Sequence, residues 1–328
     1  MSRYLSLGNV LYDSTIAVDG TFYGEYLGGQ GFHAMAGIRL WTGDVGMVTR
    51  AGEDFKDGFS RWFIDNGVSE EHVQIKLDYT SHVLMQFHED GSYGVLPLEN
   101  GLQFVPYLQG IMDPRPEDVE AAITPDTVAY YHHCMTPDRH TFEQHRKIRE
   151  KYGVRTMWEV TYAPGSQFSI SPYFSIDKLR NGAEISGMWS LNRNEAADIF
   201  KIPRENDDDM INELIKIGGE MCYYRCGSKG AYVVAGNSAV FCPMIDITTS
   251  VDPMGCGNNS TGAAMYAWCE TGDPLMTGIM AAISAGYNAR QKGPMMLITE
   301  EDTANANALA QKYYKQFPDK IQLDICVL

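Results

Sequence analysis

A glycine-rich turn within residues 251–263 (VDPMGCGNNSTGA) is the segment of the chain best suited to chemistry. Gly255 and Gly257 flank Cys256, and the small residues that follow suit the start of a helix. The first amide N–H groups of a helix lack backbone acceptors and carry partial positive charge, and glycine lets a phosphate approach the backbone closely. The turn therefore predicts an anion site of the kind used in phosphoryl transfer. Asn258 stands where such a site is expected to keep an ionised carboxylate.

Strand and helix patterns alternate along the chain and must position this turn. Such alternation indicates an α/β fold, in which a mostly parallel central sheet is covered by helices on both faces. We expect one domain over residues 1–328, because no linker rich in Pro, Gly or Ser divides it. The predicted strands are 4–10, 45–49, 128–131 and 155–160; the predicted helices include 30–41, 55–66, 140–152, 207–217 and 281–293, with a last helix and a short strand after residue 300.

Segments 14–27 and 81–104 interrupt this alternation. Both alternate polar and apolar residues around a turn signal, Asp19-Gly20 in the first and Asp90-Gly91 in the second. Each therefore predicts an antiparallel hairpin, and we expect the hairpins to pair into a small β lid inserted in the domain. Their large apolar side chains face either the body of the chain or a partner: Phe22, Tyr23, Tyr26, Met85, Phe87 and Tyr93.

Composition restricts the partners and the location. A net charge of −16 over 328 residues repels polyanions, so neither nucleic acid nor an anionic membrane surface is expected as a partner. Any phosphate must be held locally by backbone amides, a few Lys or Arg, and a divalent cation. Seven Cys without metal-like spacing predict reduced thiols. The N-terminus lacks a signal-peptide pattern, and we expect a cytoplasmic protein.

Several short motifs, in order and suitably spaced, resemble those of the ribokinase or PfkB family of carbohydrate kinases. The resemblance spans roughly Tyr4 to Gly293 and implies a ribokinase-like fold with a small β lid. It also implies ATP and Mg²⁺ as cofactors, a sugar-like or nucleoside-like small-molecule substrate, and a homodimer formed through the lid. The motifs are Gly8–Asp13 with Gly28–Ala36, Leu191–Ala197, Tyr223–Ala231 and Asp252–Asn258.

The first motif pair resembles the substrate-binding segments of that family. The resemblance implies that Asp13, Gly28, Gly29 and Gln30 bind the substrate. A carboxylate at the end of a strand can accept hydrogen bonds from two hydroxyls, and glycines admit a ligand against bare backbone. His33 stands where the family usually has Asn, and histidine is larger and titrates near neutral pH. A surface Asp beside a hairpin, and a packed structural His, are the alternatives.

The segment Leu191–Ala197 is similar to the family's N-x-x-E motif. One helical turn separates Asn192 from Glu195, so both can face one pocket. The resemblance implies that Asn192 contacts the nucleotide and that Glu195 orders water around Mg²⁺. A helix cap, Asn with Glu at the third position, explains the pair equally well.

The segment Tyr223–Ala231 resembles the family's strand and turn along which the nucleotide phosphate and ribose pass. Arg225 or Lys229 could supply positive charge there. A plain hairpin has a similar pattern. The nucleotide-binding candidates from this part of the chain are Arg225, Gly227, Lys229 and Gly230, with Asn288 in the helix that follows the glycine-rich turn.

The segment Asp252–Asn258 resembles the family's D-T-x-G-A-G-D. The resemblance implies that Gly255, Cys256 and Gly257 form the anion hole, that residue 258 occupies the base position, and that Asp252 is a possible cation contact. Asn258 cannot accept a proton at neutral pH, because an amide carbonyl is barely basic. Phosphoryl transfer depends mainly on positioning and charge neutralisation, so loss of the base weakens a kinase without abolishing it.

Other departures surround the expected pocket. Pro253-Met254 replaces the Thr-x pair that helps many relatives bind a monovalent cation, which makes potassium dependence doubtful. Glu159 and Thr161 retain polarity where the family often has D-x-N-x-R, but the Arg is missing. Two functions therefore remain open: an ATP- and Mg²⁺-dependent phosphotransferase acting on a hydroxymethyl group of a sugar, nucleoside or related polyol, and a kinase-like protein that binds a nucleotide or metabolite without turnover.

Overall fold

The computed structural model describes residues 2–89, 93–96, 114–133, 139–160, 175–247, 249–317 and 322–324. Within these ranges no helix combines the length and the apolar character that a bilayer span requires. The described cysteines are free thiols: Cys222, Cys226 and Cys242 are buried, and Cys256 and Cys269 are half-buried. Cys134 and Cys326 lie outside the described residues.

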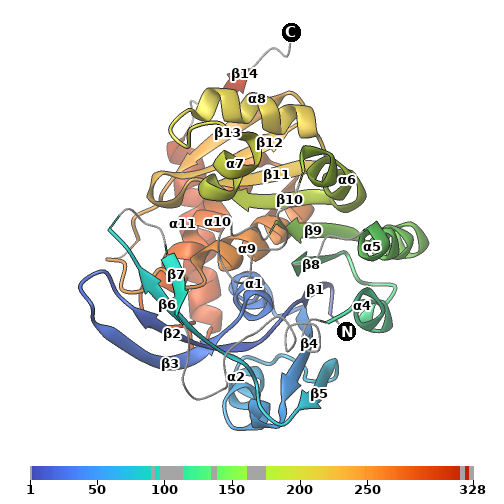
Figure 1. Cartoon of the computed structure of the whole chain (residues 1–328), viewed down its shortest axis with the longest axis vertical. Helices are drawn as coiled ribbons and strands as arrows, with labels where there is room; N and C mark the ends of the chain where they lie inside the picture. The colour runs from blue at the N-terminus through green and yellow to red at the C-terminus, as the bar shows by residue number, and fades with distance from the viewer. Residues whose placement is uncertain are drawn as a thin grey trace.

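A ten-stranded sheet forms the centre of the molecule (Figure 1). Its order is β14-β13-β12-β11-β10-β9-β8-β1-β4-β5, parallel from β5 to β11 and antiparallel from β11 to β14. The strands are β1 Tyr4–Leu7, β4 Val45–Gly52, β5 Val73–Leu77, β8 Ala129–His133, β9 Arg155–Glu159, β10 Gly187–Asn192, β11 Met221–Arg225, β12 Gly230–Ala235, β13 Ser238–Pro243 and β14 Gln322–Asp324. The predicted mostly parallel α/β sheet is confirmed.

Helices cover both faces of this sheet, because successive strand residues point to opposite sides and both sides are apolar. Tyr131 packs in the cluster that contains α1 (Gln30–Arg39), α9 (Cys256–Thr271), α10 (Pro274–Ala289) and α11 (Glu300–Gln316). Tyr130, the preceding residue, packs on the other face. The helices of that face are α4 (Pro116–Ala122), α5 (Arg139–Tyr152), α6 (Ile176–Ser186), α7 (Arg193–Phe200) and α8 (Asp207–Ile217).

A second sheet of four strands lies beside the main sheet, at the lower left of Figure 1. Its order is β3-β2-β6-β7, with β2 Leu11–Ile16, β3 Phe22–Gly28, β6 His82–Phe87 and β7 Tyr93–Leu96. The β2–β3 and β6–β7 pairs are antiparallel, as predicted for hairpins, and β2 joins them by pairing with β6 in parallel. The Asp90-Gly91 turn and residues 97–104 lie outside the described residues. We call this sheet the accessory sheet.

Some predicted element boundaries differ from the structure. The helix expected over 55–66 is a 3₁₀ turn at Glu53–Lys56 followed by α2 at Phe59–Asp65. Gly58 separates them with a non-helical ψ-φ pair, and a side chain there would meet the Tyr12 hydroxyl at 2.7 Å. The helix expected over 281–293 begins earlier, at Pro274, because Asp273 accepts a cap hydrogen bond from the Met276 amide.

Close contact between α1 and α9 brings their N-terminal ends together. A Cβ on Gly37 would lie 2.0 Å from the Asn259 carbonyl oxygen, and one on Gly262 would lie 2.2 Å from the Ala34 carbonyl oxygen. Glycine is needed at both positions, because any side chain would separate the two helix backbones. This contact places the glycine-rich turn next to the end of the accessory sheet, where β3 leads into α1.

Candidate active site

The glycine-rich turn ends in an anion corner, which we define as the backbone of residues 255–258. Gly255 caps α9 with a φ of 74°, a left-handed conformation that favours glycine. The Cys256 amide donates to the Pro253 carbonyl oxygen at 3.2 Å. Within the described ranges, the amides of Gly255, Gly257 and Asn258 donate no hydrogen bond. Of the predicted Gly255–Gly257 set, only the Cys256 amide is therefore engaged, and the Asn258 amide is a further free donor at this helix end.

Two buried polar side chains hold the corner in place. The Asp252 Oδ1 accepts a hydrogen bond from the Met254 amide at 2.9 Å, and the Asn288 Nδ2 donates to the Met254 carbonyl oxygen at 2.7 Å. The Asp252 Oδ2 accepts from the Tyr26 hydroxyl at 2.6 Å, which links the corner to the accessory sheet. Asp252 and Asn288 thus position the turn; the cation and nucleotide contacts predicted for them stay predictions.

The predicted substrate residues lie on the Gly255 side of the anion corner. Asp13 is buried, its Oδ2 accepts from the Gly29 amide at 3.2 Å, and the His33 Nε2 lies 3.5 Å from the same oxygen. Gly28 leaves room for this carboxylate, since a Cβ on Gly28 would lie 1.8 Å from the Asp13 Oδ2. The His33 ring also fills the space beside Gly255, where a Cβ would lie 2.2 Å from Nδ1.

The Gln30 amide donates to the Asn9 side-chain oxygen at 2.8 Å, which fixes the start of α1. Gln30 is half-buried at the first position of that helix. The structure therefore brings the predicted substrate residues together at one place, beside the anion corner.

Arg225, at the end of β11, supplies a positive charge at the anion corner. Its guanidinium pairs with Glu159 and lies 3.7 Å from the Glu195 Oε2. A Cβ on Gly257 would lie 2.3 Å from the Arg225 Nη1, so the guanidinium rests against the Gly257 backbone. Burial disfavours the charge of Arg225, but Glu159 and Glu195 outweigh burial and raise the pKa of the guanidinium. Burial in turn raises the pKa of Glu159, and Arg225 opposes that shift.

The Asn192–Glu195 pair forms a capping box at the start of α7. The Asn192 Oδ1 accepts from the Glu195 amide at 2.9 Å, and the Glu195 Oε2 accepts from the Asn192 amide at 2.6 Å. The helix-cap interpretation is therefore confirmed. Since Glu195 also lies beside Arg225, the metal role that the resemblance implies is compatible with the cap but stays a prediction.

The turn at Gly227–Lys229 follows Arg225 in the chain. The Lys229 side chain is half exposed, and its Nζ lies 3.9 Å from the Asp207 Oδ2 at the start of α8. Gly230 begins β12, and its φ of 125° suits glycine. Of the two cations considered for the phosphates, the structure places Arg225 and not Lys229 against the anion corner.

The side chain at the base position is already engaged. The Asn258 Nδ2 donates to the Tyr131 hydroxyl at 3.1 Å. Tyr131 is fully buried, and burial holds its pKa well above the ordinary tyrosine value. Neither group is a proton acceptor at neutral pH. Thr161, the other polar residue expected near Glu159, lies outside the described residues.

Sequence reasoning missed the pairing of Arg225 with Glu159. The two residues end β11 and β9, which are separated in the sheet by β10 alone. Side chains at the carboxyl ends of neighbouring parallel strands meet at one edge of a sheet, so the available signal was a charged residue at the end of each strand.

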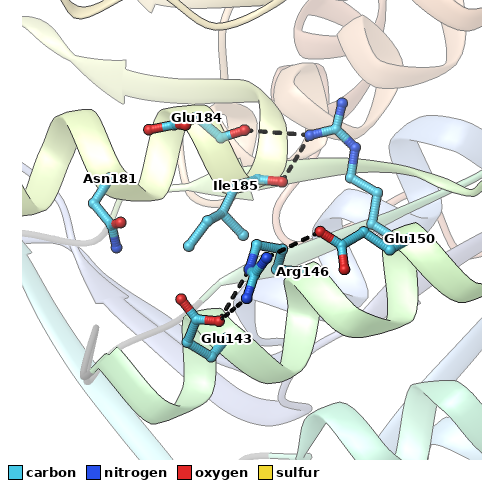
Figure 2. A pocket seen from close by; sticks show the side chains of 7 residues that line it. Glu143, Arg146, Glu150, Asn181, Glu184 and Ile185 are labelled. Carbon is cyan, nitrogen blue, oxygen red and sulfur yellow. Dashed lines mark hydrogen bonds and ion pairs between the residues drawn. The ribbon is translucent and has the colours of Figure 1, made fainter.

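A separate surface pocket lies between α5 and α6, on the face of the sheet opposite α9 (Figure 2). Arg146 pairs with Glu143 and Glu150, and Arg149 donates to the Ile185 carbonyl oxygen at 2.8 Å. Figure 2 shows Arg146 paired with Glu143 and Glu150 along one helix, with Glu184 and Ile185 on the other side of the pocket. Arg146 is thus engaged by two carboxylates of its own helix and Arg149 by backbone carbonyls, so neither guanidinium is presented to a ligand as at the anion corner.

The mostly parallel sheet with an accessory sheet and an anion corner at the start of α9 defines a ribokinase-like fold, and comparisons with known proteins agree. The family model of the pfkB family carbohydrate kinases matches residues 165–300. The resemblance of this chain to that family is thereby confirmed. No curated protein shows significant sequence similarity to the chain.

Solved structures of similar fold cover almost the whole chain. A fructokinase from Xylella fastidiosa with bound ATP is 14% identical with a TM-score of 0.71, covering 96% of this chain and 100% of its own. An adenosine kinase from Sinorhizobium meliloti is 18% identical with a TM-score of 0.70, covering 94% and 99%. A nucleoside kinase from Burkholderia thailandensis in complex with inosine is 18% identical with a TM-score of 0.67, covering 95% and 97%.

Proposed function

We propose that the protein is an ATP- and Mg²⁺-dependent phosphotransferase that acts on a hydroxymethyl group of a sugar, nucleoside or related polyol. The observation that carries this proposal is the anion corner, where unengaged amides lie against the half-buried Arg225 guanidinium on the Gly257 side and against His33, the neighbour of the buried Asp13, on the Gly255 side. Fixed donors aimed at the charge that develops in phosphoryl transfer are the main means by which such enzymes act.

The residues of this site fit a nucleoside triphosphate. Unpaired helix-terminal amides bind phosphate oxygens, and Arg225 adds a charge that the acidic chain otherwise lacks. A divalent cation would neutralise the phosphate charge, held through water by Glu195 at the edge of the corner. We assign the amides of Gly257 and Asn258 to the transferred phosphoryl group, and Asn192 to the nucleotide.

The acceptor lies, in this proposal, between Asp13 and the anion corner. Asp13, Gly28 and Gly29 orient its hydroxyl groups, and Gln30 and His33 border it. The side-chain amide of Asn258 orients the attacking hydroxyl without taking its proton.

The same site suggests a second function. Asn258 offers an amide where a carboxylate is expected, and it is hydrogen-bonded to a Tyr131 hydroxyl that cannot serve as a base. A protein that binds a nucleotide or a small metabolite without turnover would have this arrangement.

Phosphate transfer from γ-labelled ATP distinguishes the two functions. The protein is incubated with Mg²⁺ and a panel of sugars and nucleosides, and labelled products are separated from ATP. We expect a labelled acceptor with the wild-type chain and none with Gly257→Val, whose side chain would collide with Arg225 and block the corner. Saturable nucleotide binding without any labelled acceptor would support the binding protein instead.

A further inference from the structure

We propose that His33, oriented by Asp13, accepts the proton of the attacking hydroxyl in place of the missing carboxylate at position 258. This inference rests on the proposed function and names the group that would make turnover efficient. It makes His33 a catalytic residue and Asp13 a positioning residue as well as a substrate contact.

The His33 ring is buried, with 2% of its surface exposed, yet neither ring nitrogen has a hydrogen-bond partner in the part of the chain that the structure describes. A buried polar atom without a partner costs about 1–3 kcal/mol, so such an atom is expected to meet a ligand. The ring lies in the gap between the buried Asp13 carboxylate and the backbone of Gly255. In the proposal, a hydroxyl that attacks at the anion corner meets its proton acceptor at this place.

The two ring nitrogens have different neighbours, and this difference sets their roles. Nε2 lies 3.5 Å from the Asp13 Oδ2 without forming a hydrogen bond, and this carboxylate is the acceptor that we assign to a proton on Nε2. Nδ1 then presents its lone pair on the Gly255 side of the ring. Carboxylates orient catalytic histidines in this way in other enzymes.

Other described ionisable groups lie close to Asp13 and to the start of α1. Tyr26 of β3 pairs with Asp13 in register and donates to Asp252, which precedes α9. His133 of β8 lies across Gly8, 3.0 Å from where a Cβ on that glycine would be. Asp13 is the described ionisable group for which the structure gives a direct contact with the His33 ring.

The step balances without any further reactant. The acceptor oxygen forms a bond to the γ-phosphorus while the bond from that phosphorus to the β,γ-bridging oxygen breaks, and the electron pair leaves with ADP. The hydroxyl proton moves to the His33 Nδ1, the Asp13 carboxylate stabilises the resulting imidazolium, and the proton passes to water when the product leaves.

His33→Asn, assayed for transfer from ATP to the best acceptor of the panel, tests the proposal. We expect kcat to fall about 10²–10⁴-fold with nucleotide affinity unchanged. Adding Asn258→Asp to this variant should restore activity at least tenfold. His145→Asn is the matched control: His145 is buried on the opposite face, bonded to the Tyr130 hydroxyl, and burial lowers its pKa to about 3. It should leave kcat unchanged.

Each outcome decides the matter. Wild-type-like kcat in His33→Asn, or a loss confined to KM, would overturn the role of His33 while leaving the proposed function intact. No transfer by the wild-type chain would overturn both. If His33→Asn fails to fold, nitrogen NMR of the wild-type His33 ring replaces the kinetic test, because it identifies the tautomer. A proton on Nε2 supports the proposal, and a proton on Nδ1 contradicts it.

Discussion

Removing the guanidinium of Arg225 should destabilise the protein strongly, because it would leave a buried carboxylate without its cation. The exposed fractions of the side chains are 13% for Arg225, 3% for Glu159 and 10% for Glu195. Breaking a buried ion pair by removing one partner typically costs about 3–5 kcal/mol. We therefore expect Arg225→Met to lower the free energy of unfolding by about 3–5 kcal/mol at pH 7, measured by urea denaturation followed by circular dichroism.

The loss in free energy of unfolding caused by Arg225→Met should depend on pH. Burial already raises the pKa of Glu159 above its ordinary value of 4.5, and loss of Arg225 removes the group that opposes this shift. A carboxyl with a higher pKa in the folded state contributes stability that is fully present below the unfolded value and is lost as pH rises through the folded value. The deficit relative to wild type should therefore grow from pH 4.5 to pH 7.

Two controls make this prediction specific. In a Glu159→Gln background, Arg225→Met should cost much less, because an amide is cheaper to bury unpaired than a carboxylate. Arg50→Met breaks the buried Arg50–Asp118 pair on the α4 side and should destabilise the fold without weakening ADP binding, whereas Arg225→Met should weaken it. A deficit below about 1 kcal/mol, or equal costs in both backgrounds, would refute this account of Arg225.

Further substitutions test the remaining parts of the site. Gly28→Ala should raise the KM for the acceptor at least tenfold with ADP binding unchanged, because its Cβ would lie 1.8 Å from the Asp13 Oδ2; a wild-type KM contradicts the substrate role of Asp13. Tyr26→Phe should cost about 1–3 kcal/mol in urea denaturation by leaving the buried Asp252 Oδ2 without its hydroxyl donor, whereas Tyr23→Phe in the same strand should cost little. We also propose a homodimer through the accessory sheet, where Phe22 is 60% exposed; light scattering should give twice the chain mass, and Phe22→Ser should lower it.

Much of the fold could be predicted from local sequence patterns. The strands of the main sheet are short apolar runs whose two faces are both buried, and Tyr130 and Tyr131 show why such runs lack alternation. The helix boundaries were less predictable. The break at Gly58 lies where a side chain would meet the Tyr12 hydroxyl, and no local sequence signal indicates that close approach. The helix predicted over 207–217 is present, with Asn206 as its cap accepting from the Asp209 amide.

The candidate site was predictable where it depends on residues near one another in sequence. The Gly255–Gly257 turn and the Asn192–Glu195 cap are of this kind. The contacts of Arg225 with Glu159, and of His33 with Asp13, join distant segments and depend on strand order and on the approach of α1 to α9. The hydrogen bond from the Cys256 amide to the Pro253 carbonyl oxygen depends on the detailed backbone path, which residue types do not specify.

The central claim is that the backbone of residues 255–258 binds the phosphoryl group in transit. A crystal structure with a non-hydrolysable ATP analogue and Mg²⁺ tests it directly. We predict phosphate oxygens within hydrogen-bond distance of the Gly257 and Asn258 amides, with Arg225 alongside. Phosphates bound only near the exposed Lys229 turn, or no phosphate at the start of α9, would contradict the account.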